Sequence, residues 1–198
     1  MMNELTNDQT APIEQSDFEK SIKGKTVLII GSGADLDGKR LAKQIDNTNR
    51  FDIVARVNKH YGNEIDTGKR TDVIVTRWLQ WVKDGINFFT NEEIENAKQV
   101  IILNQHVGFS QTENQIVCNE LGVEKVSAGI QAVSYFLNRG AKTIYLLGFG
   151  MTKEGFMNEK KYCKHSINYK DGMKDTNQFY DWNKEKTWLK QQSKIIFL

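Results

Sequence analysis

The sequence is poor in the features that mark several classes of protein. Its 198 residues include one proline and two cysteines. Cys118 and Cys163 are too few for a disulfide framework or for a zinc site with four cysteine ligands, and we expect both to be free thiols. No apolar run approaches the roughly 20 residues of a membrane-spanning helix. The first residues are polar and acidic, so we expect no signal peptide and a soluble, cytoplasmic protein.

The net charge is also small, and it is unevenly distributed. The chain carries 27 Lys and Arg against 25 Asp and Glu, a net charge of +2, which argues against a dedicated nucleic-acid binder. Residues 1–22 hold five acids and one base, a net of −4, and we expect a disordered acidic leader there. Residues 151–198 hold ten lysines and six acids, a net of +4. We expect residues 23–198 to form a single domain in which 151–198 supply a lid and a C-terminal helix.

The sequence does contain a regular alternation of apolar runs and helical patterns. Strands are predicted for 25–30, 51–57, 71–76, 99–103 and 142–147. Helices are predicted after residue 33 and for 91–98, 110–121 and 127–138. This alternation predicts an α/β fold, a Rossmann-like and mostly parallel sheet with helices on both faces. Ligands of such sheets bind at the carboxyl ends of the strands, so the loops there are the candidate site.

The strongest local feature is Gly31-Ser32-Gly33, which directly follows the first predicted strand. Glycine lets the chain turn sharply, and exposed N–H groups at the start of a helix can hold a phosphate. The dinucleotide pattern G-x-G-x-x-G is not met because position 36 is leucine, and the chain has no Walker sequence. A tight strand–helix turn without a ligand stays open as the alternative.

Two further segments have a structural and a functional interpretation. Asp35 and Asp37 form the D-x-D pattern with which many sugar transferases hold a metal and a nucleotide, but acids at the start of a helix are favourable as caps, and we favour capping. Ser127 precedes a predicted helix, where its hydroxyl and the following N–H groups could cap the helix or bind a phosphate. Both interpretations of Ser127 stay open.

Three histidines could act as a general acid or base near neutral pH. His60 and His106 follow predicted strands, and His165 lies in the lysine-rich and aromatic tail. A solvated or structural role is favoured for each histidine taken alone. Three neighbouring lysines are expected to form a solvated face, with steering of an anionic donor as the alternative; they are Lys160, Lys161 and Lys164.

Taken in order, these segments resemble the sialyltransferases of glycosyltransferase family 29 in a short bacterial or viral form. The resemblance spans about residues 25–192. The hydrophobic run that ends in Gly31-Ser32-Gly33 resembles the start of the family's long motif. The other blocks that resemble the family are 45–46, 51–58, 66–72, 127–129 and 144–150.

The resemblance implies a variant GT-A-like fold and an inverting transferase. The donor would be a CMP-sugar, sialic-acid-like, bound without a metal or a cofactor, and the acceptor a hydroxyl group of a glycan or another molecule. The chain would act in the cytoplasm of a bacterium or of a virus-infected cell. Ser32 stands where the family usually has an asparagine. The residues implied to bind the donor nucleotide are Gly31, Ser32, Gly33, Asn58, Ser127, Ala128, Gly129 and Gly148.

The catalytic residues are implied by a match near the end of the chain. The segment from Tyr180 to Glu185 resembles the family's His-x-x-x-x-Glu, with tyrosine in place of the histidine that acts as the base. A tyrosine hydroxyl, with an ordinary pKa of about 10, is a poor base at pH 7. His165 would then stabilise the leaving phosphate or serve as the base.

Three alternatives to this sugar transferase stay open. The first is a non-catalytic nucleotide-binding module that has lost the base. The second is a transferase that modifies a viral nucleotide or nucleic acid. The third is a metal-dependent phosphotransferase on the same kind of sheet, which the missing Walker sequence disfavours.

Overall fold

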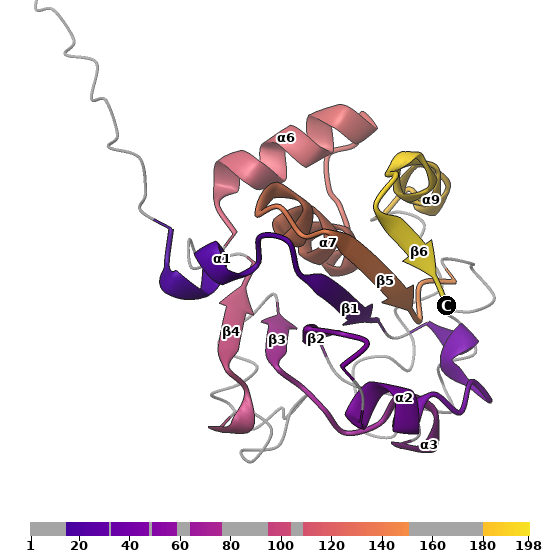
Figure 1. Cartoon of the computed structure of the whole chain (residues 1–198). Coiled ribbons are helices and arrows are strands. Elements are labelled where there is room, and N and C mark those ends of the chain that lie inside the picture. Colours follow the sequence, from indigo (N-terminus) through magenta and orange to yellow (C-terminus); the bar gives the residue numbers. More distant parts are fainter. Residues whose placement is uncertain are drawn as a thin grey trace, which may run out of the picture.

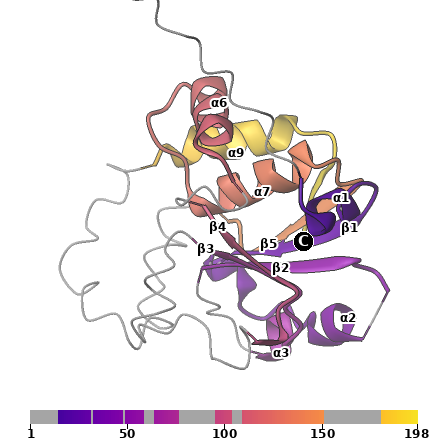
Figure 2. The same ribbon diagram turned by 90° about the vertical axis from the view of Figure 1, so that its left-hand side faces the viewer.

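The computed structural model describes residues 15–31, 33–47, 49–58, 64–76, 95–103, 109–150 and 180–198. Within these residues the chain forms a layered α/β structure around one sheet (Figure 1). The two faces of this sheet are covered by different helices, as two perpendicular views show (Figure 2). On one face lie α6 (Gln111–Leu121), α7 (Ala128–Asn138) and α9 (Trp182–Gln191), and on the other lie α2 (Ala42–Asp46) and α3 (Glu64–Thr67). In the described part of the chain no helix has the length and apolar character needed to cross a bilayer.

The sheet has six strands in the order β4-β3-β2-β1-β5-β6, and every neighbouring pair is parallel. The strands are β1 (Thr26–Ile30), β2 (Ile53–Val57), β3 (Val73–Thr76), β4 (Gln99–Ile102), β5 (Thr143–Leu147) and β6 (Ile195–Phe197). The predicted Rossmann-like parallel sheet is therefore confirmed. The order reverses between β1 and β5, because the chain builds β1 to β4 outward on one side and returns to place β5 on the other. A crevice at the carboxyl ends of two such strands is the usual ligand site of this architecture.

Alternate side chains of the central strand enter the two helix layers. Val27 and Ile29 pack with α7 on one face, and Leu28 and Ile30 pack on the other face around Leu36. All four strand residues are at most 1% exposed. A strand buried on both faces needs a continuous apolar run, which explains why β1 was recognisable from the sequence.

One buried charge fixes the connection from α3 to β3. Arg56 points from β2 away from the apolar cluster under α7 and is 1% exposed. Its Nη2 donates to the carbonyls of Thr67 (3.0 Å) and Gly68 (2.8 Å), and its Nε donates to the hydroxyl of Thr71 (2.9 Å). Arg56 thus satisfies backbone groups that would otherwise be buried without partners.

The structure differs from the sequence predictions at both ends of the chain. Part of the segment expected to be a disordered leader forms a helix, α1 (Asp17–Ser21), followed by Ile22, which is fully buried. Ser16 and Glu19 cap this helix reciprocally, a pattern that the sequence displays as Ser-x-x-Glu. Strand β6 follows α9 where only a helix was expected, since three residues are too few to show a period.

The helix predicted after Gly33 is interrupted. A single 3₁₀ turn, η1 (Ala34–Leu36), is followed by turns and then by the five-residue α2. Gly38 has a φ of +79° and Arg40 a φ of +51°, so the backbone between η1 and α2 leaves the helical region. The first half of the predicted helix 91–98, residues 91–94, lies outside the described residues.

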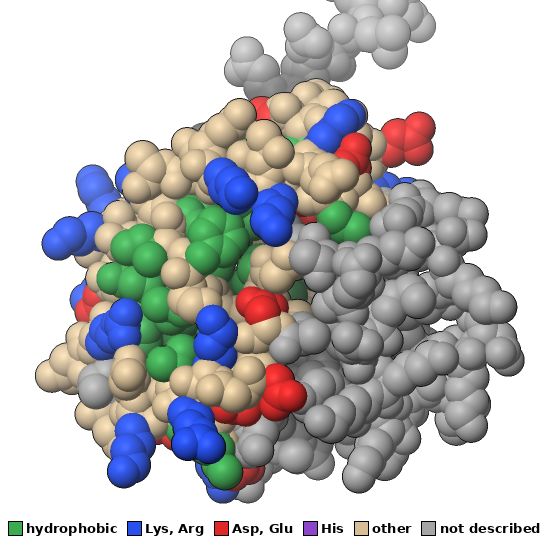
Figure 3. Space-filling model, turned by 90° about the vertical axis from the view of Figure 1, so that its right-hand side faces the viewer, with side chains coloured by type: hydrophobic (Ala, Val, Ile, Leu, Met, Phe, Trp, Pro, Cys, Tyr) green, Lys and Arg blue, Asp and Glu red, His purple; other side chains and the backbone are tan. Residues whose placement is uncertain are grey.

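Strand β6 forms one edge of the sheet and carries exposed apolar side chains. Ile196 and Phe197 are 43% and 42% exposed. The view onto this side shows apolar side chains lying among several lysines and arginines (Figure 3). Lys39 lies next to the end of β6, because its Nζ donates to the carbonyl of Leu198 at 3.0 Å. Lysines at an edge strand disfavour pairing of that edge with another chain.

One arginine joins three helices at the end of α7. Arg139, the C-cap of α7, donates through Nε to Glu19 Oε1 (2.7 Å) and through Nη1 to Glu113 Oε1 (2.8 Å). Each glutamate also accepts, through its other oxygen, the backbone amide of the serine that caps α1 or α6; these serines are Ser16 and Ser110. Because the three charged side chains are 9% to 21% exposed, the cluster is largely shielded from water.

We expect Arg139→Ala to lower the free energy of unfolding by about 3 kcal/mol, because it leaves two shielded carboxylates without their cation. Arg139→Lys should lower the free energy of unfolding less, since lysine keeps the positive charge but not the forked geometry of the guanidinium. Urea unfolding of the three proteins measures both effects. A loss below about 1 kcal/mol for Arg139→Ala would contradict the cluster's role, because that is the range of a solvated ion pair.

The same loss should depend on pH. Burial alone would raise the pKa of Glu19, but hydrogen bonds from the Ser16 amide and the Arg139 guanidinium hold it below the ordinary value of 4.5. A carboxyl with a lowered folded-state pKa stabilises the fold above its unfolded pKa and stops doing so as the pH falls through the folded value. The difference between the wild type and Arg139→Ala should therefore be constant near neutral pH and shrink below pH 4.5.

Candidate functional site

The turns that follow β1 and β5 lie in backbone contact at the carboxyl edge of the sheet. Gly31 N donates to Leu147 O at 2.8 Å, and Gly33 N donates to Gly148 O at 2.9 Å. A Cβ on Gly31 would lie 2.6 Å from Gly148 O, and Gly148 itself has a φ of +76°. Only glycine fits at these positions. The structure therefore brings together three of the residues predicted to bind the donor.

The ring of Phe149 joins this pair of turns to α7. A Cβ on Gly129 would lie 2.8 Å from Phe149 Cε1, and a Cβ on Gly31 would lie 3.1 Å from Phe149 Cε2. Phe149 is 5% exposed, so it fills the space between the first turn of α7 and the β1 turn. Its role was not predicted, although it lies within the Gly-Phe-Gly block that resembles the family.

The N-terminus of α7 faces the same edge. Ser127 is its N-cap, and the Ser127 hydroxyl accepts a hydrogen bond from Ile130 N at 3.3 Å. The amides of Ala128 and Gly129 occupy the first two helical positions, where no intrahelical acceptor exists. Such amides and the helix dipole favour an anion. Capping by Ser127 is confirmed, and phosphate binding at these amides stays a prediction.

A buried carboxylate ties α9 to the start of α7. Glu185, in the first turn of α9, is fully buried, and its Oε1 accepts the backbone N–H of Ser127 at 2.7 Å. Lys186 adds a second tie from α9, with Nζ 3.5 Å from Gly150 O. The structure thus joins Ser127 and Glu185, both predicted site residues, through a contact that holds a helix terminus. A fully buried carboxylate in such a contact has a positioning role.

Asn58 ends β2 at the same edge of the sheet. It follows β2 with a φ of +53°, and its backbone N–H donates to Val75 O at 2.7 Å. Its side-chain Oδ1 is buried and has no hydrogen-bond partner among the described residues. An unpaired buried amide oxygen is unfavourable by about 1–3 kcal/mol, and a hydrogen bond from a ligand would remove that penalty.

Asp35 has a structural role that differs from both predicted ones. Its Oδ1 accepts the backbone N–H of Gly150 at 2.9 Å. It therefore links the turn after β1 to the chain after β5, instead of capping a long helix. Within the described residues no three His, Cys, Asp or Glu side chains lie together as metal ligands would.

Several predicted residues lie outside the described part of the chain. They are Ser32, His60, His106, Lys160, Lys161, Cys163, Lys164 and His165. Tyr180 is described and half-buried. It directly precedes Asp181, the N-cap of α9, and its ring centroid lies 5.3 Å from that of Trp182.

Comparisons with known proteins support the fold. No protein-family model and no curated protein sequence matches the chain. Among solved structures, a mammalian sialyltransferase in complex with Gal-beta-1-3GalNAc-ortho-nitrophenol is similar with a TM-score of 0.55 and 17% sequence identity, over 91% of this chain and 71% of that one. A second structure of a mammalian sialyltransferase gives a TM-score of 0.53 and 18% identity, over 88% and 69%. The chain therefore has a sialyltransferase-like α/β fold.

We expect Glu185→Ala to lower the free energy of unfolding by at least about 2 kcal/mol, because the buried Ser127 amide loses its acceptor. Glu185→Gln should lower the free energy of unfolding less, since the glutamine amide oxygen can accept the same hydrogen bond. Urea unfolding with circular dichroism measures both. If Glu185→Ala were as stable as the wild type, the positioning role would be wrong and a catalytic role would regain support.

Proposed function

We propose that the protein is a sialyltransferase-like glycosyltransferase whose donor nucleotide binds at the carboxyl edge between β1 and β5. The observation that carries the proposal is the convergence there of three features. They are the glycine turns after β1 and β5, the first-turn amides of α7, which have no intrahelical acceptor, and the side-chain oxygen of Asn58, which has no hydrogen-bond partner among the described residues. The sialyltransferase-like fold supports the class of reaction. The donor we propose is a CMP-sugar, because a monophosphate needs only neutral amides to hold it.

In this mechanism the described residues bind and orient the donor. The amides of Ala128 and Gly129 would face the phosphate, and the Asn58 oxygen would accept a hydrogen bond from the exocyclic amine of the cytosine. Gly31 and Gly148 let the turns after β1 and β5 pack against each other, which would hold the two strand ends together beside the nucleotide. Amides fixed before the reaction stabilise the charge that develops on the departing phosphate without reorganisation.

The transfer step is a single displacement that inverts the anomeric carbon. The acceptor hydroxyl oxygen bonds to that carbon through an oxocarbenium-like state, the bond from the carbon to the phosphate oxygen breaks, and CMP leaves. The hydroxyl proton passes to a base, for which we propose His165, with Tyr180 as the alternative. The acceptor is a hydroxyl group, and a glycan such as the galactoside bound by the mammalian neighbour is the first choice for an assay.

A second candidate function is a nucleotide-binding module without catalysis. One observation favours it: Glu185 is buried against Ser127 instead of being open to a substrate, and the base position before it holds Tyr180. Such a module would keep the donor pocket and bind CMP without consuming a donor.

We expect CMP, without added magnesium, to stabilise the protein by about 2.7 kcal/mol when present at 100 times its dissociation constant. Asn58→Gly should weaken the binding of CMP about tenfold, since glycine keeps the left-handed backbone but removes the side-chain amide. Thermal unfolding against a nucleotide panel measures this. Asn114→Ala is the matched control, because Asn114 Oδ1 is also buried and has no hydrogen-bond partner among the described residues. Asn114 lies far from the proposed donor site, since the residue before it, Glu113, binds Arg139 at the other end of α7. Equal CMP affinity in Asn58→Gly and the wild type would contradict the assignment.

We expect the wild type to consume CMP-sialic acid and to form a new glycosidic bond when Gal-β1,3-GalNAc is supplied. His165→Ala should lower the rate at least a hundredfold, the usual contribution of a general base, while leaving CMP affinity unchanged. Chromatography of released CMP and of the product measures both. Binding of CMP with no consumption of donor would establish the non-catalytic module, and full turnover by His165→Ala would move the base to another residue such as Tyr180.

A further inference from the structure

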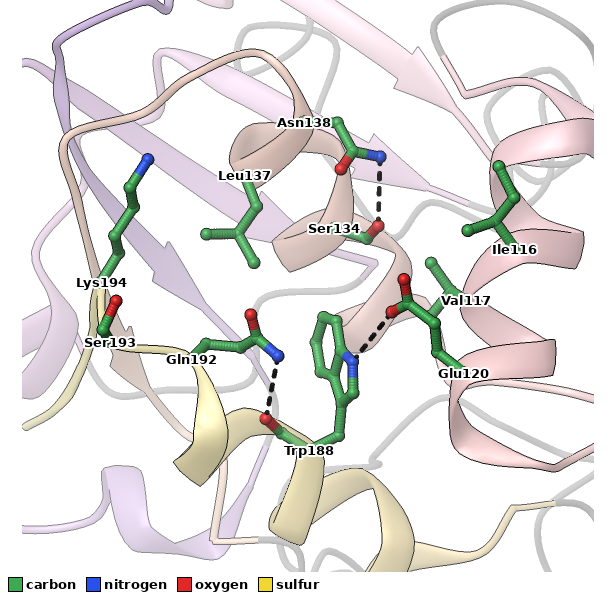
Figure 4. A pocket seen from close by; sticks show the side chains of 10 residues that line it. All are labelled: Ile116, Val117, Glu120, Ser134, Leu137, Asn138, Trp188, Gln192, Ser193 and Lys194. Atoms are coloured by element: carbon green, nitrogen blue, oxygen red, sulfur yellow. Dashed lines mark hydrogen bonds between the residues drawn. The ribbon is translucent and has the colours of Figure 1, made fainter.

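A cavity lies between the helices, away from the candidate site. It has a volume of about 270 Å³ and opens to solvent among α6, α7, α9 and the loop before β6 (Figure 4). The cavity is lined by the half of α7 around Ser134 and Asn138, whereas the candidate donor site uses Ser127. About nine helical residues, or roughly 14 Å, separate the two places.

Each helix contributes side chains that are neighbours on one of its faces. Residues three and four apart lie together on a helix. On α6 these are Ile116 and Glu120, and on α7 Ser134 and Asn138 with Leu137 beside them. At the end of α9 they are Trp188 and the C-cap residue Gln192. The walls are linked, because Trp188 Nε1 on α9 donates to Glu120 Oε2 on α6 at 3.2 Å.

The polar side chains of the cavity offer both donors and acceptors to a ligand. Gln192 Nε2 donates to Trp188 O (3.3 Å) and Asn138 Nδ2 to Ser134 Oγ (3.5 Å), so each amide retains one N–H. The oxygens Glu120 Oε1, Gln192 Oε1 and Asn138 Oδ1 accept no hydrogen bond from the described residues. These groups are spread around the opening, as the close view shows. A ligand that matches them needs several hydroxyl or amide groups at different points of its rim.

The charge and the apolar residues of the lining further restrict the class of ligand that the cavity can bind. Glu120 and Lys194 are the charged residues of the lining, so its net charge is zero and a neutral ligand is favoured over an ion. The apolar residues of the lining are Ile116, Val117, Leu137 and Trp188, of which Ile116 is 51% and Trp188 9% exposed. A purely apolar ligand would bury the oxygens without partners, which is unfavourable.

We propose that this cavity is a sugar-binding site that takes one neutral pyranose ring. A pyranose has an apolar C–H face for the apolar residues Ile116, Leu137 and Trp188 of the lining, and hydroxyls around its rim that both donate and accept hydrogen bonds. The volume is slightly below the range of about 300–1,000 Å³ for drug-sized ligands, which fits a single ring. The site is separate from the proposed donor site, and it stands whether or not the chain transfers a sugar.

The test is an NMR titration of the full chain with methyl β-D-galactopyranoside, methyl β-D-glucopyranoside, spermidine and cyclohexanol. The signal to follow is the Trp188 indole N–H, which points at Glu120 and is identified by its shift in Glu120→Gln. We expect at least one glycoside to shift it saturably with a dissociation constant near 1 mM, the usual scale of a small ligand with few contacts. Spermidine and cyclohexanol should leave it unchanged.

Variants of the lining residues, compared with variants elsewhere, test whether the sugar binds in this cavity. Gln192→Ala and Asn138→Ala each remove one side-chain amide from the rim of the cavity. Each should weaken the binding of the glycoside five- to tenfold, which is the effect of losing about one hydrogen bond. Gln115→Ala, which alters an exposed α6 side chain that bonds to Asn119 instead of lining the cavity, should have no effect. Asn58→Gly should also have none, because Asn58 belongs to the other site.

Four results would overturn the proposal. They are the absence of a shift with both glycosides at concentrations far above 1 mM, a shift with spermidine or cyclohexanol alone, unchanged affinity in both rim variants, and loss of binding in Asn58→Gly. Thermal unfolding of each variant verifies that it is folded, and Gln192→Ala and Asn138→Ala serve as independent tests if one of them fails to fold.

Discussion

The contact between the Gly31 turn and the Gly148 turn is the constraint on which the rest of the site depends. β1 and β5 are neighbours at the point where the strand order reverses, so their chains leave the sheet together. The two backbones then approach so closely that a Cβ on Gly31 would lie 2.6 Å from a carbonyl oxygen. Phe149 can lie over this contact, and α7 can approach through Gly129, only because these positions carry no side chains. This edge of the sheet is therefore closed by two backbone turns and the ring of Phe149.

Helix α7 is held at both ends by glutamates from other helices. At its start Glu185 accepts the Ser127 amide, and at its end Glu19 and Glu113 bind Arg139. The middle of α7 is buried against four strands and α6. A helix fixed in this way keeps its first-turn amides in one orientation, which a preorganised binding site requires. Glu185, which the motif match predicted to be catalytic, contacts the start of α7 through a buried hydrogen bond to its N-cap, and a catalytic role for it stays a prediction.

The sequence was sufficient for the elements with a strong local signal and insufficient for those set by distant contacts. The apolar run that became β1 and the serine cap of α7 were predicted to within one residue, because burial on both faces and N-capping are local. The three residues of β6 are set by pairing with β5, which no local pattern records. The Asp35–Gly150 bond spans 115 residues and was likewise invisible. Helix α1 was missed although its Ser-x-x-Glu capping pattern was present.

The architecture is Rossmann-like, yet its geometry is unlike that of a dinucleotide site. In dinucleotide-binding folds a pyrophosphate sits at the N-terminus of the helix that follows the first strand, and a third glycine lets that helix approach the sheet. Here the first strand is followed by a single 3₁₀ turn, and Leu36 occupies the place of that glycine, with its side chain against Gly148. The helix terminus that reaches the reversal of strand order belongs instead to α7, which begins about 100 residues later in the chain. An anion at this edge would therefore contact amides from α7.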